Sequence, residues 1–227
     1  MPPRALEPAG VALVDKPAGP SSFAVVAQIR RLTGARTGHA GTLDPFATGL
    51  LLLLSGRTTK LAPWLVGLDK RYLTDIDLTA RTSTGDPEGG VIEVLDAPDE
   101  AMLEGRLALL RGEIELPIPA ASAVKIGGER AYKLARRGID VEMPLRRSTV
   151  HALDVIAYTG DTVTLDLRVS SGTYVRAIAD ALGGHCRTLR RTEVGPFSVS
   201  DAVAPADFDP KQLLAEADVL ARIGAVA

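Results

Sequence analysis

The sequence predicts an α+β fold with a mixed, mainly antiparallel central sheet flanked by helices, and three observations support this. Residues 70–78 alternate between apolar and polar side chains, the period of a half-buried strand. Apolar residues recur at helical spacing after Ser21 and Ser22, which are good helix N-caps. Helical and strand segments do not alternate strictly along the chain, as they would in a parallel α/β fold. With 227 residues, 46% of them apolar, the chain can bury a substantial core.

The first third of the chain combines strands with one turn-rich stretch. Three glycines and a proline between Gly38 and Gly49 leave little room there for a regular element. The expected elements are a strand over 11–14, a helix from Ser21 or Ser22 to Gly34 with Phe23, Val26 and Ile29 on its apolar face, a loop over 38–49, a buried strand over 50–54, and a helix from Thr58 or Thr59 to Leu65.

The rest of the chain favours antiparallel pairs with helices between them. Glycine-rich turns separate several of the apolar segments. The expected elements are a strand over 70–78, a hairpin through the 84–90 loop into 91–95, helices over 99–110 and 129–137, paired strands over 149–158 and 162–170, a helix over 174–182, a strand over 187–197, and a C-terminal helix over about 211–223.

Composition excludes several classes of protein. One cysteine rules out an internal disulfide framework, and one cysteine with three histidines argues against a structural zinc site. The N-terminus has no apolar signal core, and the longest leucine run, Leu50 to Leu54, is far too short to span a membrane. We therefore expect a soluble cytoplasmic protein.

Charge is unevenly distributed although the formal net charge is only −2. The segment between Arg81 and Arg106 contains seven acidic residues and no basic one, whereas residues 125–147 contain seven basic and three acidic ones. A basic face could bind a polyanion. On charge alone, ordinary solvated faces are the better interpretation.

Asp44 is the first candidate for chemistry. It stands between glycine-rich turns and before Pro45, which restrains the backbone that precedes it. A carboxylate fixed in this way can act as nucleophile or general base, although an isolated Asp-Pro is usually just a turn. His39, in the same stretch, would alone be an ordinary packed or exposed histidine.

Six sequence blocks, in order, change that assessment. Together they cover roughly residues 10–200 and resemble the motifs of the bacterial B-type (TruB-type) tRNA pseudouridine synthases. The blocks are GVALVDKPAGPSS (10–22), GHAGTLDPFATGLL (38–51), DKRY (69–72), SAVK with RAYKLAR (122–136), SGTYVR (171–176) and LRRTEVGPF (189–197).

The resemblance implies the pseudouridine synthase fold and an isomerase that converts the T-loop uridine of tRNA (position 55) into pseudouridine. It makes Asp44 the catalytic carboxylate and Arg176 the arginine that pairs with it. Tyr72 would stack on the target base, Tyr174 would be a second active-site tyrosine, and Leu189 would close the pocket. The reaction of this family needs neither a metal nor an organic cofactor.

The resemblance also implies how RNA is held. His39 would wedge into the T-loop when the target base is flipped out of its stack. The T-arm of tRNA is the expected partner, the protein is expected to be a monomer without an obligatory protein partner, and several basic residues are candidates for phosphate contacts that position the RNA. These candidates are Lys16, Lys70, Lys125, Arg130 and Arg136.

Two departures from the family pattern bear on RNA binding. Ala120-Ala121 stands where relatives commonly carry an aromatic or polar residue. Many bacterial relatives continue into a small RNA-binding domain of the PUA type, whereas here we expect a catalytic domain over 1–200 and a short extension over 201–227. Weaker or more salt-sensitive tRNA binding would follow.

Three other functions compete with this interpretation. An RNA-guided pseudouridine synthase of the archaeal and eukaryotic type shares the catalytic blocks. A non-catalytic RNA-binding protein that helps tRNA fold could keep the same fold. A small-molecule hydrolase using Asp44 and His39 is the weakest alternative, because the sequence has no nucleophile elbow.

Overall fold

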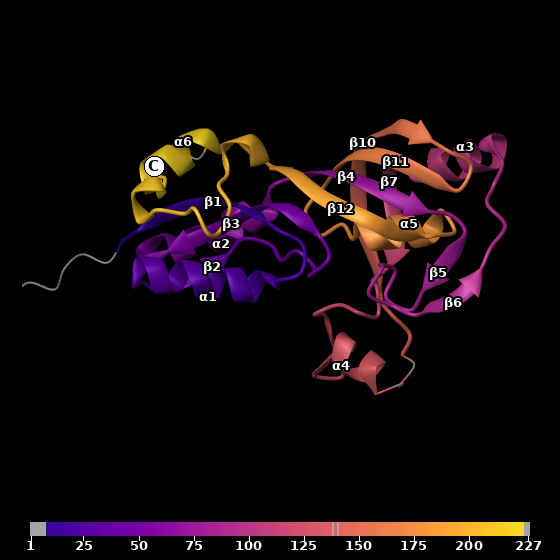
Figure 1. The fold of residues 1–227 in the computed structure, drawn as a ribbon, viewed down its shortest axis with the longest axis horizontal. Coiled ribbons are helices and arrows are strands. Elements are labelled where there is room, and N and C mark those ends of the chain that lie inside the picture. The colour runs from indigo at the N-terminus through magenta and orange to yellow at the C-terminus, as the bar shows by residue number, and fades with distance from the viewer. Residues whose placement is uncertain (1–7, 138, 140, 225–227) are drawn as a thin grey trace, which may run out of the picture. The chain divides into compact units, whose positions relative to one another are not determined.

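The computed structural model describes residues 8–137, 139 and 141–224, and the chain forms two compact units. Unit 1 contains residues up to Tyr72 together with those from Arg190 onward, and unit 2 runs from Leu73 to Leu189. Within the described ranges, no helix is both long and apolar enough to cross a membrane. Helices and a mixed sheet confirm the α+β class (Figure 1).

Unit 1 is built around strand β3, which pairs antiparallel to β1 and β2 and parallel to β12. The parallel β3–β12 pair makes the sheet mixed. The elements of the unit are β1 (Gly10–Lys16), α1 (Ser22–Thr33), β2 (Thr37–His39), β3 (Thr48–Ser55), the 3-10 helix η1 (Gly56–Leu61), α2 (Ala62–Gly67), the start of β4 (Lys70–Asp77), the end of β12 (His185–Val194), β13 (Phe197–Ser198), η2 (Val199–Asp201), η3 (Pro210–Gln212) and α6 (Glu216–Arg222).

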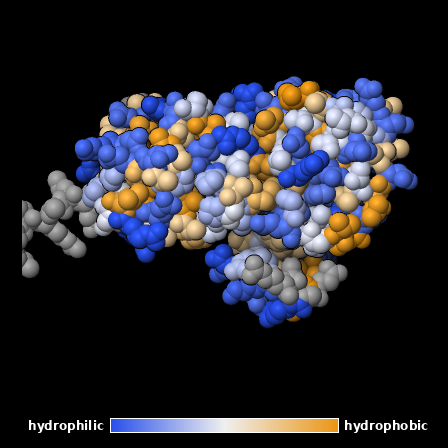
Figure 2. Space-filling model, in the orientation of Figure 1, coloured by the Kyte–Doolittle hydropathy of each residue, from blue (hydrophilic) through white to orange (hydrophobic). Residues whose placement is uncertain are grey.

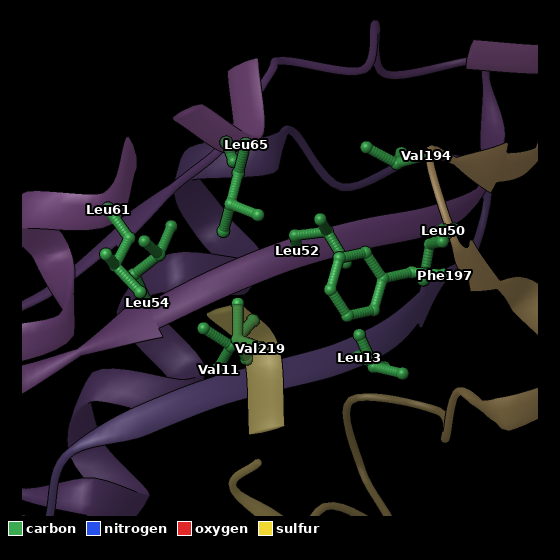
Figure 3. Close-up of a cluster of buried hydrophobic side chains, with 11 residues drawn as sticks. Val11, Leu13, Leu50, Leu52, Leu54, Leu61, Leu65, Val194, Phe197 and Val219 are labelled. Carbon is green, nitrogen blue, oxygen red and sulfur yellow. The ribbon is translucent and has the colours of Figure 1, made fainter. Parts of the chain in front are cut away.

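Strand β3 is buried on both faces, as the run Leu50 to Leu54 predicts. Because side chains alternate along a strand, β1 and β3 supply two separate apolar clusters. One packs Leu51 and Leu53 against Val25 and Ile29 of α1. The other packs Leu50, Leu52 and Leu54 with α2, α6 and the β12–β13 turn (Figure 3); its buried members are Val11, Leu13, Ala40, Leu50, Leu52, Leu54, Leu61, Leu65, Val194, Phe197 and Val219. Helices α1 and α6 accordingly lie on opposite faces of these strands (Figure 1).

The segment after β13 packs on the core of unit 1. Backbone bridges join Leu214 to Val11 and Val203 to Val14, and Val219 of α6 is fully buried. The helix expected over 211–223 is shorter than expected. Its first residues form η3, which a capping box between Asp209 and Gln212 begins, and α6 starts only at Glu216.

Unit 2 contains the strand order β4-β11-β10-β7, a separate β5–β6 hairpin and a small β8–β9 hairpin. The expected β10–β11 pair is confirmed, and it turns through Gly160 at φ 91°. The remaining elements are β5 (Ala80–Thr82), β6 (Val91–Val94), α3 (Glu100–Ala108), β7 (Gly112–Pro117), β8 (Lys125–Ile126), β9 (Glu129–Arg130), α4 (Ala131–Arg136), β10 (Leu145–Tyr158), β11 (Thr162–Val169) and α5 (Val175–Ala181).

Several expected elements differ from the structure. Thr58 does not cap a helix; it lies inside η1, where its hydroxyl donates to the carbonyls of Gly10 and Ser55. The basic helix expected from residue 129 begins at Ala131, after the short strand β9. Strand β7 was not expected, and the stretch over 38–49 includes part of β2. Phe23 was placed on the apolar face of α1, but the buried stripe runs through Val25, Val26 and Ile29 and leaves Phe23 exposed.

Candidate active site

Asp44 lies in the loop between β2 and β3, which the start of α1 holds in place. The Ser22 hydroxyl donates to the Leu43 carbonyl (2.8 Å) and accepts from the Leu43 amide (2.9 Å). The Gly19 amide donates to the Pro45 carbonyl (2.9 Å), and the Ala47 amide to the Asp44 carbonyl (3.2 Å). These bonds fix the backbone on both sides of a half-buried carboxylate.

Lys16 supports the same loop from inside the protein. Its side chain is fully buried, and its ammonium donates to the carbonyls of Pro17 (2.9 Å), Pro45 (3.0 Å) and Ala47 (2.7 Å). A buried ammonium needs such acceptors, because leaving water without them is costly. The expected phosphate contact of Lys16 stays a prediction. The contacts in the structure show that Lys16 supports the backbone of the Asp44 loop.

Arg191, on β12, ties the two ends of the loop together. Its guanidinium donates from Nε to the Leu50 carbonyl (2.7 Å) and from Nη2 to the Gly41 carbonyl (3.1 Å), and the residue is 1% exposed. Gly49 packs directly on the Arg191 backbone, where a Cβ would come within 2.2 Å of the Arg191 carbonyl oxygen. The neighbouring Arg190 forms a two-pronged ion pair with Asp15 (2.7 and 3.0 Å).

His39 ends β2, at the entrance to the loop. Its ring is half-buried, and the Nδ1 atom has no hydrogen-bond partner among the residues that the structure describes. Burial, and then the positive charge of Arg191, lower the pKa of His39 below its usual value. The imidazole is therefore neutral at pH 7 and acts as an aromatic ring.

Tyr72 and Lys70 lie on one face of β4, and both are buried. The Lys70 ammonium donates to the carbonyls of Val66 and Leu68, each at 2.5 Å. Burial, and then the charge of Arg191, lower the pKa of Lys70 to about 8. As with Lys16, the expected phosphate contact of Lys70 stays a prediction while its ammonium is engaged by backbone carbonyls.

In unit 2, Arg176 lies in the first turn of α5 and is almost fully buried. Its guanidinium forms an ion pair with Asp86 (3.4 Å) and donates to the carbonyls of Thr84 (2.6 Å) and Ala121 (3.0 Å). Asp86 is equally buried, and it also accepts from the Thr84 hydroxyl (2.5 Å) and the Glu88 amide (3.0 Å). The expected pairing of Arg176 with Asp44 concerns residues of different units and stays a prediction.

The sequence did not single out Asp86 as the residue that pairs with Arg176, because it is one of seven acidic residues in an acidic segment. The Thr-Gly-Asp-Pro turn was a usable signal, because an aspartate in such a turn can bond the backbone amide two residues on. Here that amide belongs to Glu88. Such a local pattern does not reveal an ion pair across 90 residues of sequence.

The sequence matches a family of known proteins over much of its length. Residues 30–175, more than half of the chain and including Asp44, Tyr72 and Tyr174, match the family model described as TruB family pseudouridylate synthase, N-terminal domain. The chain belongs to the TruB family.

Curated relatives are similar over most of the chain. A protein of Leifsonia xyli subsp. xyli named tRNA pseudouridine synthase B is 43% identical, covering 90% of this chain and 73% of its own length. One of the same name from Thermobifida fusca is 44% identical, covering 96% and 78%. A Cbf5 chain from a Cbf5-Nop10-Gar1 complex has a TM-score of 0.67 and 28% identity over 87% of this chain and 53% of that one, so this chain spans about half of its length.

The remaining family motif residues lie in unit 2. Tyr174 is the N-cap of α5 and half-buried, and Leu189 is buried on β12. Lys125 and Arg130 are exposed and opposite each other in the β8–β9 hairpin. The prediction for Arg136 falls on a side chain outside the part that the structure describes. Among described residues, no group of three or more His, Cys, Asp or Glu side chains could hold a metal ion.

Proposed function

We propose that this protein isomerises the T-loop uridine of tRNA to pseudouridine, with Asp44 as the essential carboxylate. One observation carries the proposal: Asp44 stands in the TruB-type loop, and buried side chains hold this loop in place. Lys16 binds the middle of the loop, and Arg191 binds its two ends. A reactive group whose backbone is fixed before the substrate binds needs no reorganisation during the reaction. Relatives 43–44% identical to this chain are named tRNA pseudouridine synthase B.

The reaction exchanges one glycosidic bond for another. The N1–C1′ bond of uridine breaks, the uracil turns, and a C5–C1′ bond forms. The hydrogen on C5 then leaves as a proton, and N1 ends with a proton, so the base changes attachment without oxidation or reduction. Asp44 starts this sequence either by attacking the nucleoside or by removing a proton from the sugar; both roles require the ionised carboxylate.

We assign the other motif residues by their likeness to the family. Arg176 keeps the Asp44 carboxylate ionised, because a nearby guanidinium favours the charged form. Tyr72 stacks on the uracil, a contact that tolerates either face of a turning base. Tyr174 packs on the base or assists loss of the C5 proton, and Leu189 closes the pocket.

The T-loop of the RNA must open before Asp44 can reach the target uridine. Flipping a base out of a folded loop costs a few kcal/mol of stacking, and we assign His39 to the space that the displaced bases leave. Exposed Lys125 and Arg130 supply phosphate contacts that fix the position of the RNA without reading its sequence. We place this activity in the cytoplasm and in a monomer.

A guided enzyme is the second candidate, because the Cbf5 chain with a similar fold was solved in a complex with Nop10 and Gar1. The two candidates differ in what they require. A stand-alone tRNA enzyme converts a bare transcript, whereas a guided enzyme needs further components.

The test is nucleoside analysis of a tRNA transcript incubated with the purified chain alone. We expect one pseudouridine per transcript, located in the T-loop and absent when that uridine is replaced by cytidine. No pseudouridine from a transcript that the protein still binds would contradict the proposal and favour the guided or the RNA-folding role.

A further inference from the structure

Phe23 is an exposed aromatic residue with no role in the core. It is 70% exposed, although the next two residues of the buried stripe of α1, Val25 and Val26, pack on the strands. Single exposed apolar residues are common on protein surfaces and need no explanation by themselves. The surface over α1 mixes hydrophobic and hydrophilic residues (Figure 2). What distinguishes Phe23 is its neighbour.

The Phe23 ring packs edge-to-face against the His39 ring, with centroids 5.4 Å apart and planes at 82°. Edge-to-face contact is a favourable geometry for an aromatic pair. Because the His39 ring is half-buried and Phe23 is mostly exposed, Phe23 extends the His39 surface outward. The two rings form one aromatic surface at the entrance to the Asp44 loop.

The position of Phe23 is set by the same contacts that hold the loop. Ser22, the residue before it, bonds both polar backbone atoms of Leu43, the residue before Asp44. Ser21 caps α1 by accepting from the Ala24 amide (3.2 Å), which fixes the first turn around Phe23. An aromatic ring held rigidly beside the loop loses little freedom on binding.

We propose that Phe23 stacks on an unpaired base of the RNA loop and, with His39, forms a two-ring wedge. This rests on the proposed function and names a further RNA-binding residue for it. Bases of a flipped-open loop expose their π faces, and exposed aromatic side chains are the usual partners of such bases. A paired duplex offers no such face, so Phe23 distinguishes an open loop from a stem.

The experiment measures the Kd of a T-arm stem-loop, with its target uridine replaced by cytidine, and the Kd of a continuous duplex of the same stem. The variants are Phe23→Ala, Phe23→Leu and Phe23→Trp. Leu32→Ala is the matched control, because Leu32 is an exposed apolar residue of the same helix. Thermal melting accompanies each variant; if Phe23→Ala melts early, Phe23→Leu and Phe23→Trp carry the comparison.

We expect Phe23→Ala and Phe23→Leu to weaken stem-loop binding by about tenfold or more, the usual effect of losing one stacked base. Phe23→Trp and Leu32→Ala should stay within about twofold of wild type, since one keeps a stacking ring and the other removes none. Duplex binding should not change in any variant.

Two results would overturn the inference: stem-loop binding by Phe23→Leu equal to that of wild type, or an equal loss on stem-loop and duplex. Conversion of tRNA by wild type separates the two proposals. A wild type that converts tRNA while Phe23→Leu binds normally refutes only the role of Phe23. A wild type that converts none refutes the proposed function, and loop-selective loss in Phe23→Leu would then still support base stacking.

Discussion

Lys16 and Arg191 are buried cations that donate to backbone carbonyls around the Asp44 loop. These bonds fix the backbone of the loop before any substrate binds. At the residue scale, two buried cations therefore hold the backbone of the loop that carries Asp44.

Replacing Lys16 with Met should destabilise the protein and reduce activity. The change removes the ammonium that donates to the buried Ala47 carbonyl, and the Pro45 carbonyl keeps only its bond from the Gly19 amide among the bonds described above. We expect a cost of about 1–3 kcal/mol in the free energy of unfolding. Chemical denaturation measures this, and kcat should fall with it because the Asp44 loop loosens. Lys60→Met is the control, since Lys60 is exposed and its ion pair with Glu216 lies at the surface. Equal stability of the two variants would contradict the role of Lys16.

Lys70 makes stability depend on pH in a defined window. Its folded pKa of about 8 lies below its usual 10.5, so between these values the unfolded chain binds more protons than the folded one. The free energy of unfolding should therefore rise from pH 8 to 10.5, by up to about 3 kcal/mol, relative to Lys70→Met. Denaturant titrations of both proteins across this range test it; parallel pH profiles would show that burial does not shift the pKa of Lys70.

Breaking the Arg176–Asp86 pair should be costly, because it leaves a buried charge without its partner. We expect Asp86→Ala to lower the free energy of unfolding by about 3–5 kcal/mol. Glu115→Ala, which breaks the exposed Arg147–Glu115 pair, should change it by less than about 1 kcal/mol. Similar losses in the two variants, measured by denaturation, would argue against a tightly coupled buried pair.

At the scale of elements, the parallel contact between β3 and β12 sets where the loop ends. Arg191 lies opposite Gly49 in the register, and its side chain reaches both Gly41 and Leu50. The chain around Asp44 therefore depends on a strand about 150 residues later in the sequence. Arg191 of the LRR segment therefore supports the segment that carries Asp44.

Gly49→Ala should prevent or severely weaken this contact. The φ of Gly49 is +100°, and a Cβ would come within 2.2 Å of the Arg191 carbonyl oxygen. We expect a loss of at least about 3 kcal/mol, or failure to fold, from steric and backbone strain together. Gly38→Ala in β2 is the matched control, because its Cβ would meet open space and should cost little. Equal melting temperatures of Gly49→Ala and Gly38→Ala would contradict the close packing of Gly49 on Arg191.

The elements that sequence alone predicted well carry strong local signals. Strand β3 is a continuous leucine run, and α1 has a serine N-cap and a glycine C-cap at φ 65°. Strand β7 was missed because its pattern has one buried residue, Ile114, among exposed or half-buried ones. Phe23 was misplaced because it fits helical spacing in the sequence, whereas only packing decides which side of the helix is covered.

At the scale of the whole molecule, the motif residues are shared between the two units. Asp44, His39 and Tyr72 belong to unit 1, and Tyr174, Arg176 and Leu189 to unit 2. The sequence pointed to these residues because the resemblance carries motif positions directly, and their roles stay predictions. It could not place Lys16 inside the protein or predict the ion pair of Arg176 with Asp86, since burial and long-range pairing arise only when the chain folds.

The measurement that tests the central claim most directly is tritium release from tRNA labelled at C5 of uracil. Forming the C5–C1′ bond expels that hydrogen, so release reports the chemistry and not binding. We expect release by wild type and by Asp207→Asn, a surface control, and none by Asp44→Asn, which keeps the shape of the side chain but not its charge. Release by Asp44→Asn at the wild-type rate would contradict the role of Asp44, and no release by wild type would contradict the proposed reaction itself.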